Sequence, residues 1–261
     1  MHANPCDRCV SRSVFSKTSV VFRGLLGWGS LLICLLSAMV VAEGAGLRIG
    51  AFSALEIGEA PGDGWRATEL PSTKPARIAL VRDRGVAVVE IEADNAASSL
   101  VRDVDWDISA YPTLNWRWRV SRTVSAGDVN AKSGDDFAAR LYVTFDIPMN
   151  QLSLFDRTRL KVARWVFGDD VPAAALCYVW GNGEPVGTSV WSAYTDRVRI
   201  IVLRNRDDDI GAWVGESRNV AEDYRLAFGG PAATPNGVAI ASDTDQTGES
   251  VIAWFGDITA E

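Results

Sequence analysis

Two groups of carboxylates in this sequence have the residue types and spacing that cation binding or catalysis requires. The segment 242–248 (SDTDQTG) follows an apolar run and places Asp243, Asp245 and Thr247 at alternate positions. Closely spaced side-chain oxygens suit a hard cation, and the final glycine permits the turn that gathers them. The twelfth position of a standard calcium loop falls on Trp254, which excludes an EF-hand. A non-standard calcium site at Asp243, Asp245 and Thr247 is the one cofactor site predicted, and a turn bonded to its own backbone is the alternative.

Asp135 and Asp136 form the second group, directly before a segment that contains Arg140 and Tyr142. Adjacent carboxylates can ligate a cation, act as general acid and base, or pair with arginine. If residues 138–146 form a strand, Asp136, Arg140 and Tyr142 point to the same face. A ligand site and an ion-pair network between neighbouring strands both fit this pattern.

Arginine outnumbers lysine nineteen to three in residues 43–261. Four of these arginines occupy polar positions of alternating segments, where side chains point away from the core. Guanidinium groups beside a tyrosine suit a carboxylated or sulfated saccharide, whereas pairing with neighbouring carboxylates would leave no free positive charge. The predicted ligand-binding residues are Arg117, Arg119, Asp135, Asp136, Arg140, Tyr142 and Arg199.

Short segments with period-two alternation predict the strands that position these residues. Strands are expected at 77–82, 86–93, 98–106, 114–120, 138–146, 176–180, 197–204, 211–216, 237–241 and 251–258. Three apolar stripes should lie buried between two sheets: Leu114, Trp116 and Trp118; Leu141, Val143 and Phe145; Val198, Ile200 and Val202.

Two segments break the alternation and are predicted to be helices. Residues 152–167 have apolar side chains at mostly three- and four-residue spacings, and residues 219–228 end at two glycines. No regular strand–helix–strand alternation appears, which argues against a doubly wound parallel sheet. The sequence therefore predicts a mainly β fold over 43–261, a single antiparallel β-sandwich domain of jelly-roll type with one or two short helical insertions.

An uncharged stretch, residues 24–42, precedes this domain. Its densest apolar part, 31–42 (LLICLLSAMVVA), has the length of a signal-peptide core, and Val40 and Ala42 are small residues at −3 and −1 of a cut after Ala42. The stretch is also just long enough to anchor the chain in a bilayer. Residues 1–42 are therefore expected to be a signal peptide or an N-terminal anchor. The protein should be periplasmic or secreted, with membrane contact only through this segment if it is not cleaved.

Composition excludes several classes of function. The one histidine, His2, lies in the targeting segment, so the domain lacks histidine-based triads and histidine metal ligands. Residues 43–261 carry 22 basic and 32 acidic side chains, and this net charge of −10 disfavours nucleic acid as a partner. Cys177 is the single cysteine of the domain, and its apolar neighbours predict a buried thiol without a disulfide.

Five phrases stand together in this chain: YPTLNWRWRV (111–120), GDDFAARLYVTFD (134–146), LCYVW (176–180), RNVAEDYRLAFGG (218–230) and VAIASDTDQTG (238–248). Together they resemble the bacterial proteins grouped as domain-of-unknown-function family 3047. The likeness covers roughly Trp65 to the C-terminus and implies an exported or envelope-associated bacterial protein. The family brings no established activity, so no residue role follows from it.

Two classes of function remain. The first is an exported envelope protein that binds a saccharide or anionic ligand on one sheet face without catalysis. The second is a carbohydrate-active hydrolase or lyase that uses paired carboxylates or a tyrosine–arginine pair, and a hydrolase needs two carboxyl groups about 5–10 Å apart. Binding is favoured because no group of residues carries a catalytic motif, and catalytic residues stay unassigned. A purely structural role is also compatible with the sequence.

Overall fold

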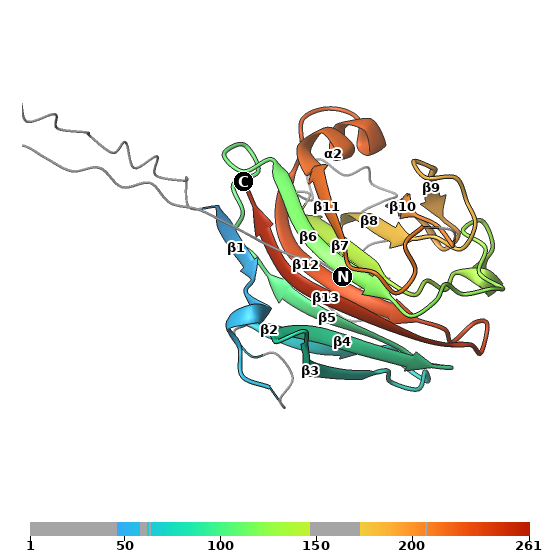
Figure 1. Ribbon diagram of the computed structural model, residues 1–261. Helices are drawn as coiled ribbons and strands as arrows, with labels where there is room; N and C mark the ends of the chain where they lie inside the picture. Colours follow the sequence, from blue (N-terminus) through green and yellow to red (C-terminus); the bar gives the residue numbers. More distant parts are fainter. Residues whose placement is uncertain (1–45, 58–61, 63, 147–172, 207) are drawn as a thin grey trace, which may run out of the picture. The chain divides into compact units, whose positions relative to one another are not determined.

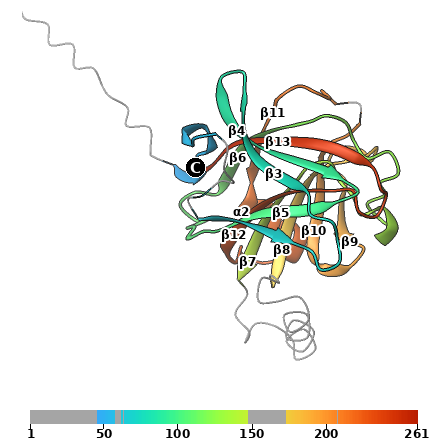
Figure 2. The same cartoon turned by 90° about the horizontal axis from the view of Figure 1, so that it is seen from below.

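A computed structural model describes residues 46–57, 62, 64–146, 173–206 and 208–261. These residues belong to one compact unit, Ala42–Glu261. Their strands form two sheets, one of six strands and one of seven (Figure 1). Figure 2 shows the sheets as two layers, with β13 in one and β5 in the other.

The six-stranded sheet has the order β11-β6-β13-β4-β3, and β1 pairs with β13 outside this path. All of its pairs are antiparallel. Its strands are β1 (Leu47–Gly50), β3 (Arg77–Asp83), β4 (Val86–Asp94), β6 (Thr113–Val120), β11 (Val214–Asn219) and β13 (Ser250–Ala260).

The seven-stranded sheet has the order β2-β5-β12-β7-β8-β10-β9. Its pairs are antiparallel except β8 with β10, which run parallel. Its strands are β2 (Trp65–Glu69), β5 (Ala97–Asp103), β7 (Arg140–Asp146), β8 (Ala174–Trp180), β9 (Ser189–Ser192), β10 (Thr195–Arg204) and β12 (Thr234–Asp243).

The connections of the chain cross repeatedly from one sheet to the other, as in a jelly roll. From β4 to β7 successive strands change sheet each time, and β11, β12 and β13 do the same. The predicted antiparallel β-sandwich is confirmed, with the parallel β8–β10 pair as a departure. Three strands of only four or five residues, β1, β2 and β9, were not predicted from the alternation.

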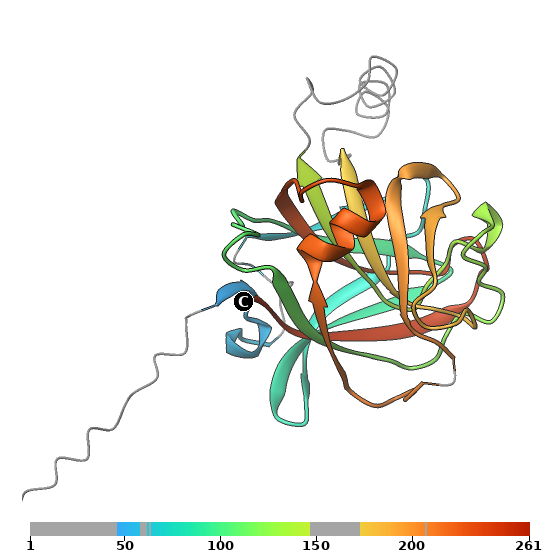
Figure 3. The ribbon, with the colours of Figure 1, turned by 90° about the horizontal axis from the view of Figure 1, so that it is seen from above.

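One of the two predicted helices lies within the described residues. Helix α2 (Val220–Phe228) begins where the Asn219 side chain accepts a hydrogen bond from the Glu222 N–H at 2.9 Å, and it ends at Gly229. It lies at one end of the two sheets (Figure 3), where Tyr224 packs against Phe145. The predicted helix at 152–167 lies outside the described residues. Two short 3-10 turns, η1 (Phe52–Ala54) and η2 (Lys132–Gly134), complete the helical structure of the described residues, which include no helix able to cross a membrane.

The main core lies between the sheets and contains two of the three predicted apolar stripes. The stripe on β6 (Leu114, Trp116, Trp118) and the stripe on β7 (Leu141, Val143, Phe145) are fully or almost fully buried there. Tryptophan rings contact one another in this core: the ring centroid of Trp118 lies 5.5 Å from that of Trp116, edge to face, and 5.8 Å from that of Trp180.

The third stripe, on β10, does not face this core, and that prediction is wrong. Ile201 and Leu203 of β10 point between the sheets, whereas Ile200 and Val202 lie in a second apolar cluster and Val198 is only partly buried beside it. The second cluster covers the outer face of β8 and β10 with two residues of the β6–β7 connection, Val129 and Phe137. Because β10 is apolar on both faces, as parallel-paired strands often are, alternation could not select the inner one.

Candidate functional site

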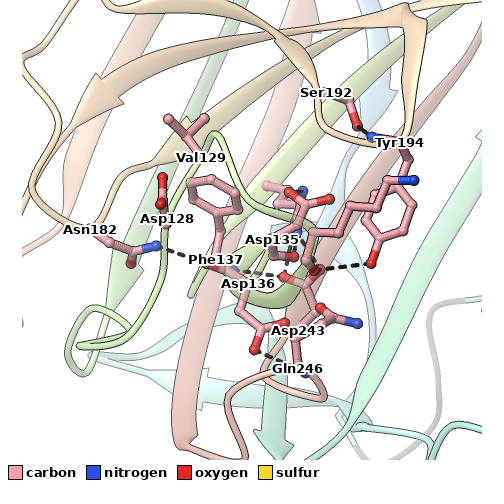
Figure 4. A network of polar contacts seen from close by, with 12 residues as sticks. Asp128, Val129, Asp135, Asp136, Phe137, Asn182, Ser192, Tyr194, Asp243 and Gln246 are labelled. Atoms are coloured by element: carbon pink, nitrogen blue, oxygen red, sulfur yellow. Dashed lines mark hydrogen bonds and ion pairs between the residues drawn. The ribbon is translucent and has the colours of Figure 1, made fainter.

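The two carboxylate groups that lie far apart in the sequence form a single cluster in the structure. Asp135 and Asp136 follow η2 and precede β7, while Asp243 ends β12 and Asp245 lies in the turn after it. Strands β7 and β12 pair with Arg140 opposite Ala241, so the groups meet on the outer face of the seven-stranded sheet. We call these four residues the aspartate cluster, of which Figure 4 labels Asp135, Asp136 and Asp243.

Arg140 binds this cluster together and is almost completely buried, with 3% of its surface exposed. Its Nε donates to Asp243 Oδ1 at 2.9 Å and its Nη2 lies 2.5 Å from Asp243 Oδ2, a bidentate pair. Its Nη1 donates to Asp135 Oδ1 at 3.3 Å, and its Nη2 also donates to the Asp135 carbonyl. Arg140 therefore serves the ion-pair network that the sequence offered as an alternative to ligand binding.

Asp136 is fully buried and holds the turn after β12 against the β6–β7 connection. Its Oδ2 accepts the backbone N–H groups of Gln246 at 3.1 Å and Thr247 at 2.7 Å. Its own carbonyl accepts a hydrogen bond from the Asn182 amide at 2.8 Å. Asp136 is consequently committed to protein donors and fixes the position of Asp245.

Burial and nearby negative charge raise the pKa of two members of the cluster, Asp243 and Asp245. Burial raises the pKa of the Asp243 carboxyl to about 6, although the positive charge of Arg140 acts in the opposite direction. Burial, followed by the negative charge of Asp136, also raises the pKa of Asp245. A proton or a cation would relieve this repulsion, and Arg140 supplies only one positive charge within it.

Three carboxylates of the cluster could hold a metal ion. Asp136, Asp243 and Asp245 each offer one oxygen, and these three atoms lie within 4.8 Å of one another. The structure thus joins two of the predicted calcium ligands, Asp243 and Asp245, to Asp136. The third, Thr247, donates its backbone N–H to Asp136, and within the described residues its buried hydroxyl oxygen has no hydrogen-bond partner.

Thermal unfolding tests the predicted calcium site. A ligand that binds only the folded chain raises its Tm, so wild type is expected to unfold at a higher temperature in millimolar calcium than in a chelator. Asp245→Asn should abolish that shift, because it removes a partly exposed carboxylate without touching the Arg140 network. An identical Tm for wild type under both conditions would exclude the site.

Tyr142 lies on the same outer face as Arg140 and above a buried thiol. Burial raises the pKa of the Cys177 thiol to about 12, although Arg140 and a hydrogen bond with Tyr142 act in the opposite direction. A thiol with this pKa is almost entirely protonated at neutral pH and is a poor nucleophile. The predicted buried, unpaired Cys177 is confirmed.

The other predicted ligand residues lie elsewhere, so the expectation of one shared face is wrong. Arg117 and Arg119 project from β6, on the outer face of the other sheet, and stack on Trp213. Arg199 lies on β10 beside the edge strand β9. It stacks on Trp191, which contacts Phe228 of α2, and its Nε donates to Ser189 Oγ at 2.7 Å. Alternation identifies the polar positions of a strand, but it does not say to which sheet that strand belongs.

Tyr194, which the sequence patterns did not single out, stands beside the aspartate cluster. The residue is 53% exposed, its hydroxyl donates to the Lys132 carbonyl at 3.1 Å, and the Lys132 ammonium lies 5.3 Å from the ring centroid. Burial raises the pKa of Tyr194, and the charges of Asp135 and Asp245 raise it further, which places the phenol within their electrostatic reach. The residue lies in the turn between β9 and β10, a segment without regular periodicity.

The two sheets define a β-sandwich protein with a polar site on the outer face of one sheet. The chain belongs to the family described as "Protein of unknown function (DUF3047)", whose model matches residues 63–259. The family resemblance of the sequence phrases is thereby confirmed. No curated protein matches the chain.

Several solved structures are similar to this chain at low sequence identity. The family 11 carbohydrate-binding module of cellulase Lic26A-Cel5E of Clostridium thermocellum has a TM-score of 0.42 and 8% identity, covering 82% of this chain and 93% of that chain. The xyloglucanase domain of NopAA from Sinorhizobium fredii has a TM-score of 0.41 and 12% identity, covering 78% and 98%. Endoglucanase 3 of Trichoderma harzianum, from family GH12, has a TM-score of 0.39 and 10% identity, covering 84% and 99%.

Proposed function

We propose that this protein binds a saccharide without catalysis, at the surface that runs from Tyr194 to the aspartate cluster. The observation that carries the proposal is an aromatic ring, half exposed to solvent, held beside a group of carboxylates. Aromatic side chains contribute a large apolar area to a binding contact, and about half of the surface of Tyr194 is open to solvent.

The chemistry of this surface matches a polyhydroxylated ring. A sugar presents apolar C–H groups on its faces and hydroxyl groups at its edge, so it needs an apolar platform flanked by hydrogen-bonding groups. Tyr194 supplies the platform, and the partly exposed Asp245 carboxylate accepts from hydroxyls. The exposed Gln246 amide and the Lys132 ammonium, which lies 5.3 Å from the Tyr194 ring centroid, add donors to this surface.

The charge of the surface favours a neutral saccharide over the acidic one expected from the sequence. Four carboxylates surround two cationic side chains here, and Arg140 is already occupied by Asp135 and Asp243. An anionic ligand would meet net negative charge here, and among the described residues of this surface Lys132 is the one cation that is not paired with a carboxylate.

The state of the buried carboxylates supports binding rather than hydrolysis. Both oxygens of Asp243 face Arg140, and Asp136 accepts two backbone N–H groups. A general acid or nucleophile must reach the substrate, and neither side chain is free to do so. This supports a binding protein over the alternative of a glycoside hydrolase or lyase.

The proposal includes export to the periplasm or beyond, supported by the uncharged run 24–42 and the small residues before a cut after Ala42. N-terminal sequencing of the protein recovered from cells tests it. A mature chain that begins at Glu43 is expected, and recovery of the intact leader in the cytosolic fraction would contradict it.

Glycan-array screening with neutral oligosaccharides, followed by calorimetric titration of the hits, tests the binding site. Tyr194→Ala is expected to weaken binding about tenfold, because it removes a stacking contact of about 1–1.5 kcal/mol. Tyr194→Phe keeps the ring and should bind as wild type does. Reducing-end release, measured in parallel, should stay at the level of the buffer blank.

Trp191→Ala is the matched control, because this aromatic is also partly exposed on the β9 edge but contacts Phe228 and Arg199 instead of the cluster. The affinity of Trp191→Ala for a neutral oligosaccharide should equal that of wild type. If Tyr194→Ala and Trp191→Ala bind a neutral glycan equally well, or if wild type binds none, the proposed site is wrong. Release of reducing ends by wild type would instead favour the hydrolase.

A further inference from the structure

The outer face of the six-stranded sheet carries a row of alternating arginine and tryptophan side chains. The Arg119 guanidinium carbon lies 3.9 Å from the ring centroid of Trp254 and 5.4 Å from that of Trp213. The Arg117 guanidinium lies 4.7 Å from Trp213. We call these four residues the arginine–tryptophan row, and they lie on a different sheet from the aspartate cluster.

Three members of the row are tied to neighbouring acids. Trp213 Nε1 donates to Asp83 at 2.6 Å, and Arg119 Nη2 lies 3.4 Å from the same carboxylate. Trp254 Nε1 donates to Glu90 at 2.8 Å. These contacts hold both indoles and Arg119 in place, while the Arg119 Nε is buried without a hydrogen-bond partner among the described residues.

Arg117 is the exception, because its charge has no counterpart in the described part of the chain. It makes no hydrogen bond or ion pair there, and its stacking on Trp213 is its one charge-dependent contact. Arg199, by comparison, also stacks on a tryptophan but donates to both the hydroxyl and the carbonyl of Ser189. Arg117 therefore presents a partly buried guanidinium with unused donors.

The backbone of β13 is shaped to receive this side chain. The pairing of β13 with β6 shifts register between Phe255 and Ile258, and Gly256 lies in that irregularity. A Cβ added at Gly256 would stand 2.3 Å from Arg117 Nε and 2.5 Å from its Cγ. Only glycine leaves room for the Arg117 side chain to lie along the strand, so the guanidinium is held between Gly256 and Trp213 before any ligand arrives.

We propose that Arg117 forms the centre of a second binding site, which takes an oxyanion group, a carboxylate or a sulfate. Guanidinium groups bind such planar or tripodal groups through paired N–H donors, and prior stacking reduces the entropy lost on binding. The two carboxylates beside the row are held by other groups, Asp83 by Trp213 and Arg119 and Glu90 by Trp254 and Arg77, so neither is paired with the Arg117 guanidinium. This proposal keeps the prediction that Arg117 binds an anionic group, but it places that group on the six-stranded sheet and not beside Arg140.

Titration with sodium glucuronate, followed through the indole N–H signal of Trp213 in 15N-resolved NMR, tests this site at constant ionic strength. Wild type should show a saturable shift with glucuronate and none with glucose. Acetate and sulfate are run beside it: equal affinity for acetate means that the carboxylate alone is recognised, and tighter glucuronate binding means that the sugar ring contributes.

Arg117→Met keeps the apolar stem on Trp213 and should abolish the saturable shift, whereas Arg117→Lys should weaken binding several-fold because it loses the two-pronged geometry. Arg199→Met removes another stacked arginine and should leave the titration unchanged, as should Tyr194→Ala, which separates this site from the proposed saccharide site. A shift that does not saturate, that chloride reproduces, or that persists in Arg117→Met would overturn the proposal.

Discussion

Replacing Trp118 with alanine is expected to lower the free energy of unfolding by about 3–5 kcal/mol. The side chain is completely buried between the sheets and contacts the rings of Trp116 and Trp180. Its removal leaves a cavity that packed strands cannot close. The substitution also removes the indole N–H that Glu216 accepts at 3.0 Å, which leaves this carboxylate with Arg204 as its partner. Urea unfolding followed by far-UV circular dichroism measures the effect.

Trp118→Phe separates the two contributions, because it restores most of the buried ring but not the indole N–H. It should cost clearly less than the alanine variant. Trp191→Ala, at a partly exposed tryptophan, should cost least of the three. A loss below about 1 kcal/mol for Trp118→Ala, the range of ordinary surface substitutions, would mean that this stripe does not form the core.

The success of the β6 stripe and the failure of the β10 stripe have one physical cause. On β6, apolar Trp116 and Trp118 alternate with charged Arg117 and Arg119, so only one face can be buried, and the sequence predicts which. Residues 200–203 of β10 are all apolar, because this strand is covered on both faces. Period-two reasoning has no information about a strand that is buried twice.

The aspartate cluster shows where sequence reasoning stopped. Both carboxylate groups were identified as candidates, but more than a hundred residues separate Asp136 from Asp243. Their meeting depends on β7 pairing with β12 in a register that sets Arg140 opposite Ala241. Local patterns predict that strands exist, whereas long-range pairing partners follow from the packing of the whole sandwich. Tyr194 was not predicted as a site residue because it lies in a turn, where no periodic pattern marks the side chains that face a site.

Arg140→Met is expected to lower the free energy of unfolding by about 3–5 kcal/mol at neutral pH, because it leaves buried carboxylates without their cation. Asp243→Asn should also destabilise the fold, since it leaves Arg140 with Asp135 alone, but asparagine still accepts the Phe137 N–H that Asp243 accepts at 2.9 Å. The double variant should lose less free energy of unfolding than the sum of the two single variants. Each single substitution leaves one charge of the Arg140–Asp243 pair buried without its partner, whereas the double variant removes both charges.

The loss in Arg140→Met should depend on pH through Asp243. Burial raises the pKa of this carboxyl to about 6 in the folded chain, and Arg140 holds it down. Without Arg140 the folded pKa rises further above the unfolded value of about 3.9. At a pH between the unfolded and the folded pKa of Asp243, the folded chain binds more protons than the unfolded chain. The free energy of unfolding therefore falls as the pH rises from the unfolded to the folded pKa.

The stability difference between wild type and Arg140→Met should therefore widen from pH 5 to pH 8 and narrow on acidification. The double variant, Arg140→Met with Asp243→Asn, lacks the titrating carboxyl. The stability difference between this double variant and the single variant Asp243→Asn should therefore stay nearly constant from pH 5 to pH 8. Urea midpoints measured at several pH values decide between the outcomes. A loss in Arg140→Met that is the same at pH 5 and pH 8 would show that Asp243 does not carry the uncompensated charge, and that Arg140 stabilises the site through its contact with Phe137 and its bond to the Asp135 carbonyl instead.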